Sequence, residues 1–183
     1  MRIISGSARG VQLKSPKGNS TRPTSDRVKE SIFNILRNDL LDSDVLDLFA
    51  GTGALGLESL SRGSRSAAFI DNATAKLIQE NSIKTKLNDR SRILNMDVIA
   101  ALDYFQRHYE SFDLIFCDPP YSKTLFDKIF PTLNQSSILR IGGKLIVEHG
   151  IADKKIPTLE KLTLTREIDY GHTTSIWIFQ REE

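Results

Sequence analysis

Residues 47–56, DLFAGTGALG, are the clearest indication of the fold, because they join a buried strand to a helix through a glycine-rich turn. The apolar run Val45–Phe49 is typical of a short strand, and Ala54–Arg62 is typical of a helix. Gly51 and Gly53 permit a tight turn and let a ligand approach the backbone where a Cβ would clash. The sequence therefore predicts the first βα unit of a domain that binds a nucleotide-type ligand.

The same alternation of strand and helix continues toward the C-terminus. The further units are strands Ser66–Ile70, Arg92–Asn95, Asp113–Cys117 and Lys144–Glu148, with helices Ala73–Leu87, Val98–Gln106 and Lys123–Leu133. Consecutive βα units imply a parallel sheet with helices on both faces. Leu162–Ile168 and Thr174–Gln180 alternate apolar and polar residues with no helix between them, so they predict an antiparallel hairpin. The expected fold is an α/β, three-layer, Rossmann-like sheet whose last strand is antiparallel.

The N-terminal part has a different character. Arg2–Ile4 and Val11–Leu13 predict a small β-hairpin, and a polar loop follows it. Ser25 is a candidate N-cap for a helix with one apolar face, formed by Val28, Ile32, Ile35, Leu36 and Leu40. We therefore divide the chain into a basic hairpin and loop, residues 1–24, and one domain, residues 25–183.

The composition excludes several classes of protein. A chain of 183 residues with 39% hydrophobic residues can bury one core without disulfides or metal. The single cysteine, Cys117, excludes a disulfide framework and a cysteine-rich zinc site, and the three scattered histidines do not have the spacing of metal ligands. No apolar run approaches the roughly 18 residues that cross a bilayer, and no secretory signal is visible. We expect a cytoplasmic, metal-free monomer without membrane contact.

Charge is distributed unevenly along the chain. Residues 1–29 hold seven Lys and Arg and one acid, whereas residues 30–183 hold 18 Lys and Arg and 22 acids. A basic segment on a slightly acidic body favours a polyanionic partner approached from one side. On charge alone, a solvated surface segment that binds nothing is an equal alternative.

Three acidic residues mark the expected cofactor site. Asp71 ends the second strand, where a carboxylate can accept hydrogen bonds from ribose hydroxyls, or can simply shape a turn. Asp97 ends the third strand beside the expected adenine position, and it is equally a candidate helix N-cap. Asp47 lies inside an apolar strand, so it needs backbone donors or a cofactor ammonium group as partners.

The segment FCDPPY, residues 116–121, follows the fourth strand and carries the expected chemistry. Pro119 and Pro120 restrict the backbone, so that the Asp118 carboxylate and the carbonyl that follows it form a rigid set of acceptors. Tyr121 adds an aromatic surface. Acceptors beside a stacking ring suit the exocyclic amino group of a flat base.

These residues resemble those of a known family. Asp118-Pro119-Pro120-Tyr121 matches the D/N-P-P-Y motif of S-adenosylmethionine-dependent amino-group methyltransferases, and the last hairpin is similar to the antiparallel end of their class I sheet. The segments MRIISGSARG (1–10), RPTSDRVKE (22–30) and DLFAGTGALGLE (47–58) together resemble the RsmD family, over residues 1 to about 180. That family methylates guanine N2 in bacterial 16S ribosomal RNA. His172 departs from its pattern, and no role is carried to it.

The resemblance implies a role for each group of residues. The catalytic residues would be Asp118, Pro119, Pro120 and Tyr121; S-adenosylmethionine would be bound by Asp47, Phe49, Ala50, Gly51, Thr52, Gly53, Asp71 and Asp97; and 16S rRNA by Arg9, Lys14, Arg22, Arg27 and Lys29. Hydrogen bonds from guanine N2 to Asp118 and to the Pro119 carbonyl would favour a tetrahedral nitrogen and direct its lone pair toward the methyl donor. Whether Asp118 also takes the proton, and whether free rRNA or an assembling subunit is the substrate, stay open.

Three other functions remain possible at this point. The D-P-P-Y motif equally serves methylation of adenine N6, cytosine N4 or a glutamine side chain. The spacing Gly51-x-Gly53-x-x-Gly56 also fits a NAD-dependent oxidoreductase, although 183 residues leave no separate substrate domain. A non-catalytic RNA-binding module could retain the same fold.

Overall fold

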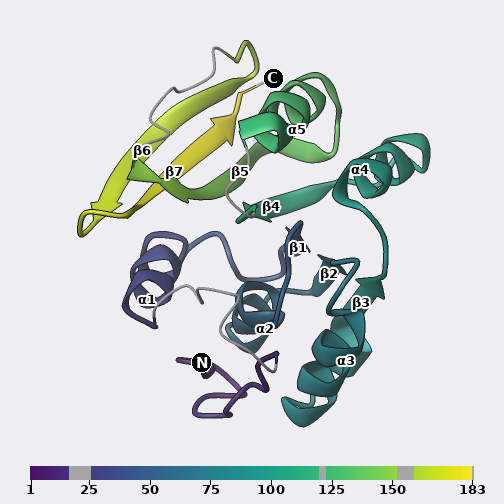
Figure 1. The fold of residues 1–183 in the computed structure, drawn as a ribbon, viewed down its shortest axis with the longest axis vertical. Coiled ribbons are helices and arrows are strands. Elements are labelled where there is room, and N and C mark those ends of the chain that lie inside the picture. Colours follow the sequence, from purple (N-terminus) through teal and green to yellow (C-terminus); the bar gives the residue numbers. More distant parts are fainter. Residues whose placement is uncertain (17–25, 120–122, 152–158, 183) are drawn as a thin grey trace.

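A computed structural model describes residues 1–16, 26–119, 123–151 and 159–182, and for 123–126 only the backbone. One seven-stranded sheet runs through the molecule (Figure 1). Its strands are β1 Asp44–Asp47, β2 Ser66–Ile70, β3 Ser91–Leu94, β4 Phe112–Cys117, β5 Leu139–Gly150, β6 Leu162–Tyr170 and β7 Thr174–Arg181. The order across the sheet is β3-β2-β1-β4-β5-β7-β6. The pairs among β1 to β5 are parallel, whereas β7 is antiparallel to both β5 and β6.

This topology distinguishes two of the expected functions. A dinucleotide-binding sheet orders its six parallel strands 3-2-1-4-5-6. Here β7 enters antiparallel between β5 and β6, which confirms the predicted class I methyltransferase arrangement and disfavours the NAD-dependent enzyme. The switch point of the sheet lies between β1 and β4, where ligands of open α/β sheets bind beyond the carboxyl ends of the strands.

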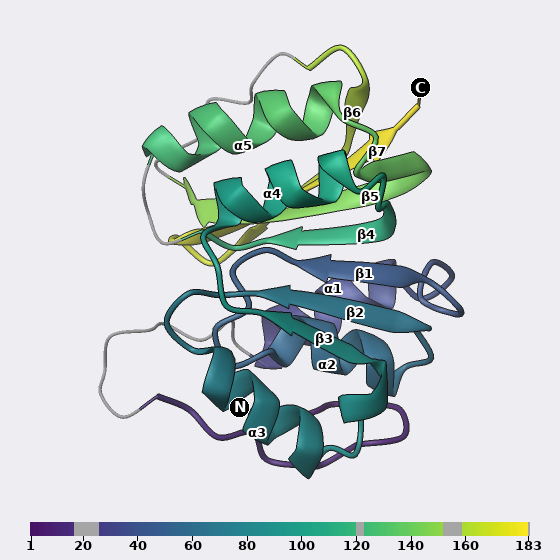
Figure 2. The same cartoon turned by 90° about the vertical axis from the view of Figure 1, so that its right-hand side faces the viewer.

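Helices cover both faces of the sheet, as Figure 2 shows. They are α1 Asp26–Ile35, α2 Ala54–Ser61, α3 Ala75–Lys84, the short η1 Asn88–Arg90, α4 Val98–Arg107 and α5 Lys123–Gln135. Alternate residues of a strand point to opposite faces, and the two hydrophobic clusters follow that alternation. Leu114 and Phe116 pack with α1, α2 and α3, whereas Ile115 and Cys117 pack with α4 and α5. The result is three layers with two cores.

Several element bounds differ from the predicted ones. The helix predicted over Ala73–Leu87 is shorter, because backbone amides at its expected start bind the Asp71 carboxylate instead. Strand β5 begins five residues before the predicted Lys144. Gly143 makes this early start possible, because a Cβ there would lie 2.8 Å from the Asp113 carbonyl oxygen.

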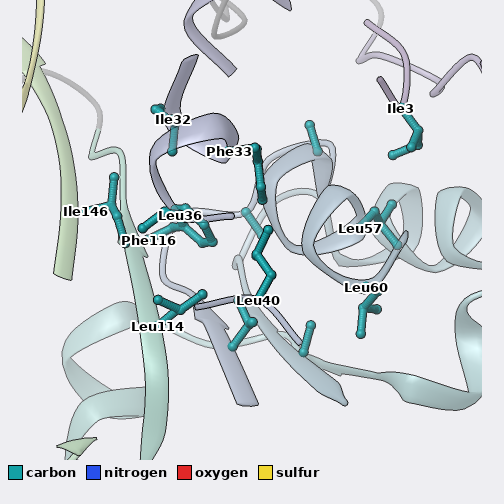
Figure 3. Close-up of a cluster of buried hydrophobic side chains, with 14 of the residues drawn as sticks. Ile3, Ile32, Phe33, Leu36, Leu40, Leu57, Leu60, Leu114, Phe116 and Ile146 are labelled. Carbon is teal, nitrogen blue, oxygen red and sulfur yellow. The ribbon is translucent and has the colours of Figure 1, made fainter. Parts of the chain in front are cut away.

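The N-terminal segment packs against the domain. The predicted hairpin is present with a single bridge, Arg2 to Gln12, and a hydrogen bond from the Ile3 amide to the Val11 carbonyl. Ile3 and Leu13 are buried in the cluster formed with α1 and α2, and Figure 3 shows Ile3 near Leu57. The described part of this segment therefore shares the core of the domain. The loop and the Ser25 cap lie outside the described residues.

Candidate active site at the carboxyl edge of the sheet

A row of carboxyl groups follows the carboxyl ends of the five parallel strands. Asp47 ends β1, Asp71 follows β2, Asp97 lies beyond β3, Asp118 follows β4, and Glu148 lies near the end of β5. Strand register places these ends side by side. Sequence reasoning missed Glu148 as a site residue, although it is the last residue of the predicted fifth strand and therefore occupies the equivalent position.

The glycine-rich loop between β1 and α2 is open where a ligand would approach. Gly51 has a φ of 53°, and a Cβ there would meet only the Phe49 carbonyl oxygen, at 3.9 Å. Gly53 also has positive φ, but a Cβ there would lie 3.1 Å from Ile78 in the core. Gly56 is needed for packing, since its Cβ would lie 2.3 Å from the Phe69 ring. Of these three glycines, only Gly51 leaves ligand space.

Asp47 is enclosed by the protein. Its side chain is 2% exposed, and Oδ2 accepts a hydrogen bond from the Gly56 amide at 3.1 Å. Burial, together with repulsion from Asp71, raises the pKa of Asp47 to about 7. The predicted backbone donor is thus present. No ion pair among the described residues reaches Asp47.

Asp118 lies in an equally unfavourable environment for a negative charge. Burial raises its pKa well above the usual range, and repulsion from Glu148 and then Asp47 raises it further. Burial also raises the pKa of the adjacent Cys117 thiol, which therefore stays protonated and is no nucleophile. Two carboxyl groups that disfavour the charge of a third at the same edge fit a cationic ligand. The predicted catalytic residues Pro120 and Tyr121 lie outside the described residues, and Pro119 is buried.

Asp71 organises the loops on both sides of it. Oδ2 accepts from the Gly51 amide at 3.0 Å, and Oδ1 accepts from the Ala73 and Thr74 amides, both at 2.8 Å. The interpretation of Asp71 as a turn residue is therefore confirmed, and the ribose contact stays a prediction. Each carboxylate oxygen has two lone pairs, so these bonds leave acceptor capacity for a ribose.

Asp97 is the N-cap of α4. Its Oδ1 accepts from the Ile99 amide at 2.8 Å and from the Ala100 amide at 3.4 Å. These bonds satisfy two of the four backbone donors that a helix start leaves open. The helix-cap interpretation is confirmed, and a contact to adenine stays a prediction.

The predicted RNA-binding residues fall into different environments. Arg9 and Arg27 are exposed, and no ion pair within the described ranges involves either of them. Lys14 is exposed and pairs with Glu80 at 2.8 Å. Arg22 lies outside the described residues.

The prediction that Lys29 contacts RNA phosphates is wrong, because its side chain is buried. Its side chain is 0% exposed, pairs with Glu58 at 3.3 Å, and donates to the Arg2 carbonyl oxygen. Burial lowers the pKa of Lys29, and the Glu58 charge partly opposes that shift. Helical spacing carried a signal that was not used, since Lys29, Phe33 and Leu36 lie on one side of the helix.

Membrane-spanning helices and metal-binding clusters are both absent from the described residues. No helix there is long and apolar enough to cross a membrane. No group of three or more His, Cys, Asp or Glu side chains in the same ranges could hold a metal ion.

Comparison with known proteins shows the family. The family described as Conserved hypothetical protein 95 matches residues 1–180. Ribosomal RNA small subunit methyltransferase D of Escherichia coli K12 is 32% identical over 185 residues, covering 100% of this chain and 90% of that protein. The Bacillus subtilis protein YlbH is 38% identical over 176 residues, covering 94% of this chain and 95% of its own length.

Solved structures agree with this assignment. Escherichia coli yhhF has a TM-score of 0.87 at 33% identity, covering 100% of this chain and 98% of that one. A Salinibacter ruber RNA methyltransferase in complex with S-adenosyl-L-homocysteine shares the fold, with a TM-score of 0.68 at 14% identity and coverage of 88% and 95%. The chain belongs to the Conserved hypothetical protein 95 family, the RsmD family of rRNA methyltransferases.

Proposed function

We propose that this protein transfers a methyl group from S-adenosylmethionine to the exocyclic N2 of a guanine in 16S ribosomal RNA. The observation that carries transfer to an exocyclic amino group is the Asp118 carboxyl, which follows β4 at the switch point of the sheet, in the D-P-P-Y motif. The resemblance of residues 1–10, 22–30 and 47–58 to the RsmD family supports guanine as the base. Family membership supports the rRNA substrate, since relatives over nearly the whole chain are small subunit rRNA methyltransferases.

The residues at the carboxyl edge fit this cofactor. When bound, S-adenosylmethionine supplies a methyl group on a positively charged sulfur. Repulsion from Glu148 and Asp47 disfavours the charged form of Asp118, so a cationic ligand relieves an unfavourable interaction that already exists in the protein. Asp71 would accept from the ribose, and Gly51 leaves the backbone accessible beside it. Binding of a cation lowers the pKa of Asp118 and therefore favours its ionised form.

The ionised Asp118 carboxylate and the Pro119 carbonyl act as paired acceptors for the guanine amino group. Because the N2 lone pair is delocalised into the ring, these hydrogen bonds activate it by favouring a tetrahedral nitrogen. The leaving group of the cofactor is already good, so alignment and electrostatics supply most of the rate enhancement. The aromatic ring of Tyr121 would hold the extruded base by stacking.

Positive charge for the RNA backbone comes from the exposed residues near the N-terminus. Arg9 and Arg27 supply side chains that face solvent, and Arg22 belongs to the same basic stretch of sequence. Phosphate contacts of this kind position a nucleic acid without reading its bases. Recognition of one guanine therefore depends on the groups that contact the base, Asp118 among them.

The test is methyl transfer followed by nucleoside mass spectrometry. We expect N2-methylguanosine in 16S rRNA, assayed both as free RNA and in small subunit particles. Asp118→Ala should lower turnover by roughly 10²-fold or more while S-adenosylmethionine affinity stays within about threefold. Asp103→Ala, which removes an exposed carboxylate of α4, is the matched control and should retain activity.

Each other outcome contradicts a specific part of the proposal. Methylated adenine or cytosine as the product would contradict the guanine substrate. Cofactor and RNA binding without transfer would indicate a binding module. Normal turnover of Asp118→Ala would contradict the role of that carboxylate.

A further inference from the structure

Asn81 on α3 is a buried polar side chain that the proposed reaction does not use. It is 0% exposed. Its Oδ1 accepts a hydrogen bond from the Lys14 amide at 2.7 Å, and its Nδ2 donates to the Lys14 carbonyl oxygen at 3.0 Å. The same Nδ2 donates to the Thr52 carbonyl oxygen at 2.9 Å. One side-chain amide thus binds the end of the N-terminal hairpin and the middle of the glycine-rich loop.

Neighbouring contacts join the same two segments. The Thr52 hydroxyl donates to the Met1 sulfur at 3.7 Å, and Met1 accepts from the Leu13 amide at 3.0 Å. Lys14 also pairs with Glu80, the residue before Asn81. The open end of the hairpin, residues 1 and 12–14, therefore lies directly against the loop that carries Gly51.

We propose that Asn81 is a positioning residue that couples the N-terminal hairpin to the cofactor loop, so that a ligand on either segment changes affinity for a ligand on the other. The inference rests on the proposed function, which places the cofactor beside Gly51 in the glycine-rich loop and RNA phosphates on the hairpin. Asn81 holds three of its four possible hydrogen bonds to these two segments. A shift of the Thr52 carbonyl therefore strains or releases the Asn81 side-chain amide, which also holds Lys14.

Coupling of this kind is reciprocal in free energy, and its usual range corresponds to 5- to 150-fold changes in affinity. If Asn81 had a purely structural role, its substitution would lower the stability of the protein, but the affinities for cofactor and RNA would still depend on each other. Asn134 on α5 provides the comparison, because it is also a buried asparagine and its Oδ1 accepts from the Lys161 amide at 2.9 Å. It contacts neither the hairpin nor the glycine-rich loop in any hydrogen bond within the described ranges.

The first experiment measures the dissociation constant of S-adenosylhomocysteine with and without a 16S rRNA fragment. For the unaltered protein we expect RNA to change that constant at least fivefold. Asn81→Ala should reduce the change to less than twofold, whereas Asn134→Ala should retain it. An unchanged ratio in Asn81→Ala, or a ratio near one in the unaltered protein, would overturn the inference.

The second experiment needs neither RNA nor a variant. Hydrogen exchange of the Lys14 amide is measured in the unaltered protein, with and without saturating S-adenosylhomocysteine. We expect the ligand to slow exchange at Lys14 at least fivefold and to leave the Lys161 amide unchanged. Equal exchange at Lys14 in both states contradicts the coupling. Failure of rRNA methylation with this protection present contradicts the proposed function and leaves the inference standing.

Discussion

Burial raises the pKa of Asp47, and this makes stability depend on pH. Between the unfolded value near 4 and the folded value of about 7, the native state binds more protons than the unfolded state. The free energy of unfolding therefore falls as pH rises, by up to about 1.4 kcal/mol per pH unit for one group. That contribution is fully present below about pH 4 and is lost by pH 7.

Asp47→Asn should remove this contribution. The amide oxygen can still accept from the Gly56 amide, and no charge develops at any pH. We expect the free energy of unfolding, measured in urea between pH 5 and 8, to fall less steeply in Asp47→Asn than in the unaltered protein. Parallel pH profiles would show that Asp47 stays ionised in the folded state.

Asp71→Ala tests the proposed ribose contact. We expect the dissociation constant of S-adenosylmethionine to rise, by about 1.5–3 kcal/mol in binding free energy, because hydrogen bonds to a charged acceptor are lost. Turnover at saturating cofactor should stay close to normal, since Asp71 does not face the reacting nitrogen. Calorimetry checks the affinity. An unchanged dissociation constant would leave Asp71 with the turn role alone.

At the scale of elements, a buried ion pair fixes the N-terminal hairpin against α1 and α2. Glu58 of α2 pairs with Lys29 of α1 and with Arg62, and it accepts from the Ile4 amide at 2.7 Å and the Ser5 amide at 3.0 Å. Both Glu58 and Lys29 are 0% exposed. The carboxylate is thus the common partner of three segments.

Glu58→Ala should destabilise the protein by about 3–5 kcal/mol, because it leaves the Lys29 charge buried without its partner. Lys29→Met should cost clearly less, since Glu58 retains Arg62 and two backbone amides. Urea unfolding of both variants measures the difference. Equal losses would contradict the central role of Glu58.

At the scale of the whole molecule, charge distribution predicts the salt dependence of RNA binding. Each lost phosphate contact lowers the slope of log affinity against log salt by about 0.7–0.9. Arg9→Ala combined with Arg27→Ala should therefore lower that slope by roughly 1.5 and leave cofactor affinity nearly unchanged. Lys29→Met removes a cation of the same sequence region but a buried one, so the slope should stay unchanged. A slope insensitive to the double substitution would contradict the phosphate contacts.

The order of the elements and the place of the site follow from local patterns in the sequence. Alternating strand and helix periods imply a parallel sheet, and parallel strands bring Asp47, Asp71 and Asp118 to one edge. Local rules sufficed because each element is encoded by its own apolar period and its own turn residues. The same rules also supplied both candidate roles of Asp97, of which the helix cap is confirmed.

Which charged and polar groups face water depends on packing between segments that are distant in the sequence. Sequence alone predicts Lys29 to be a surface cation, because its partner Glu58 lies 29 residues further along the chain, on another helix. Asn81 gave no signal at all, because its partners Lys14 and Thr52 are distant in sequence. The raised pKa of Asp118 arises from Glu148 and Asp47 on neighbouring strands. Helical spacing indicates the buried side of α1, but the partner of each buried group depends on which distant segments pack together, and a local pattern does not name that partner.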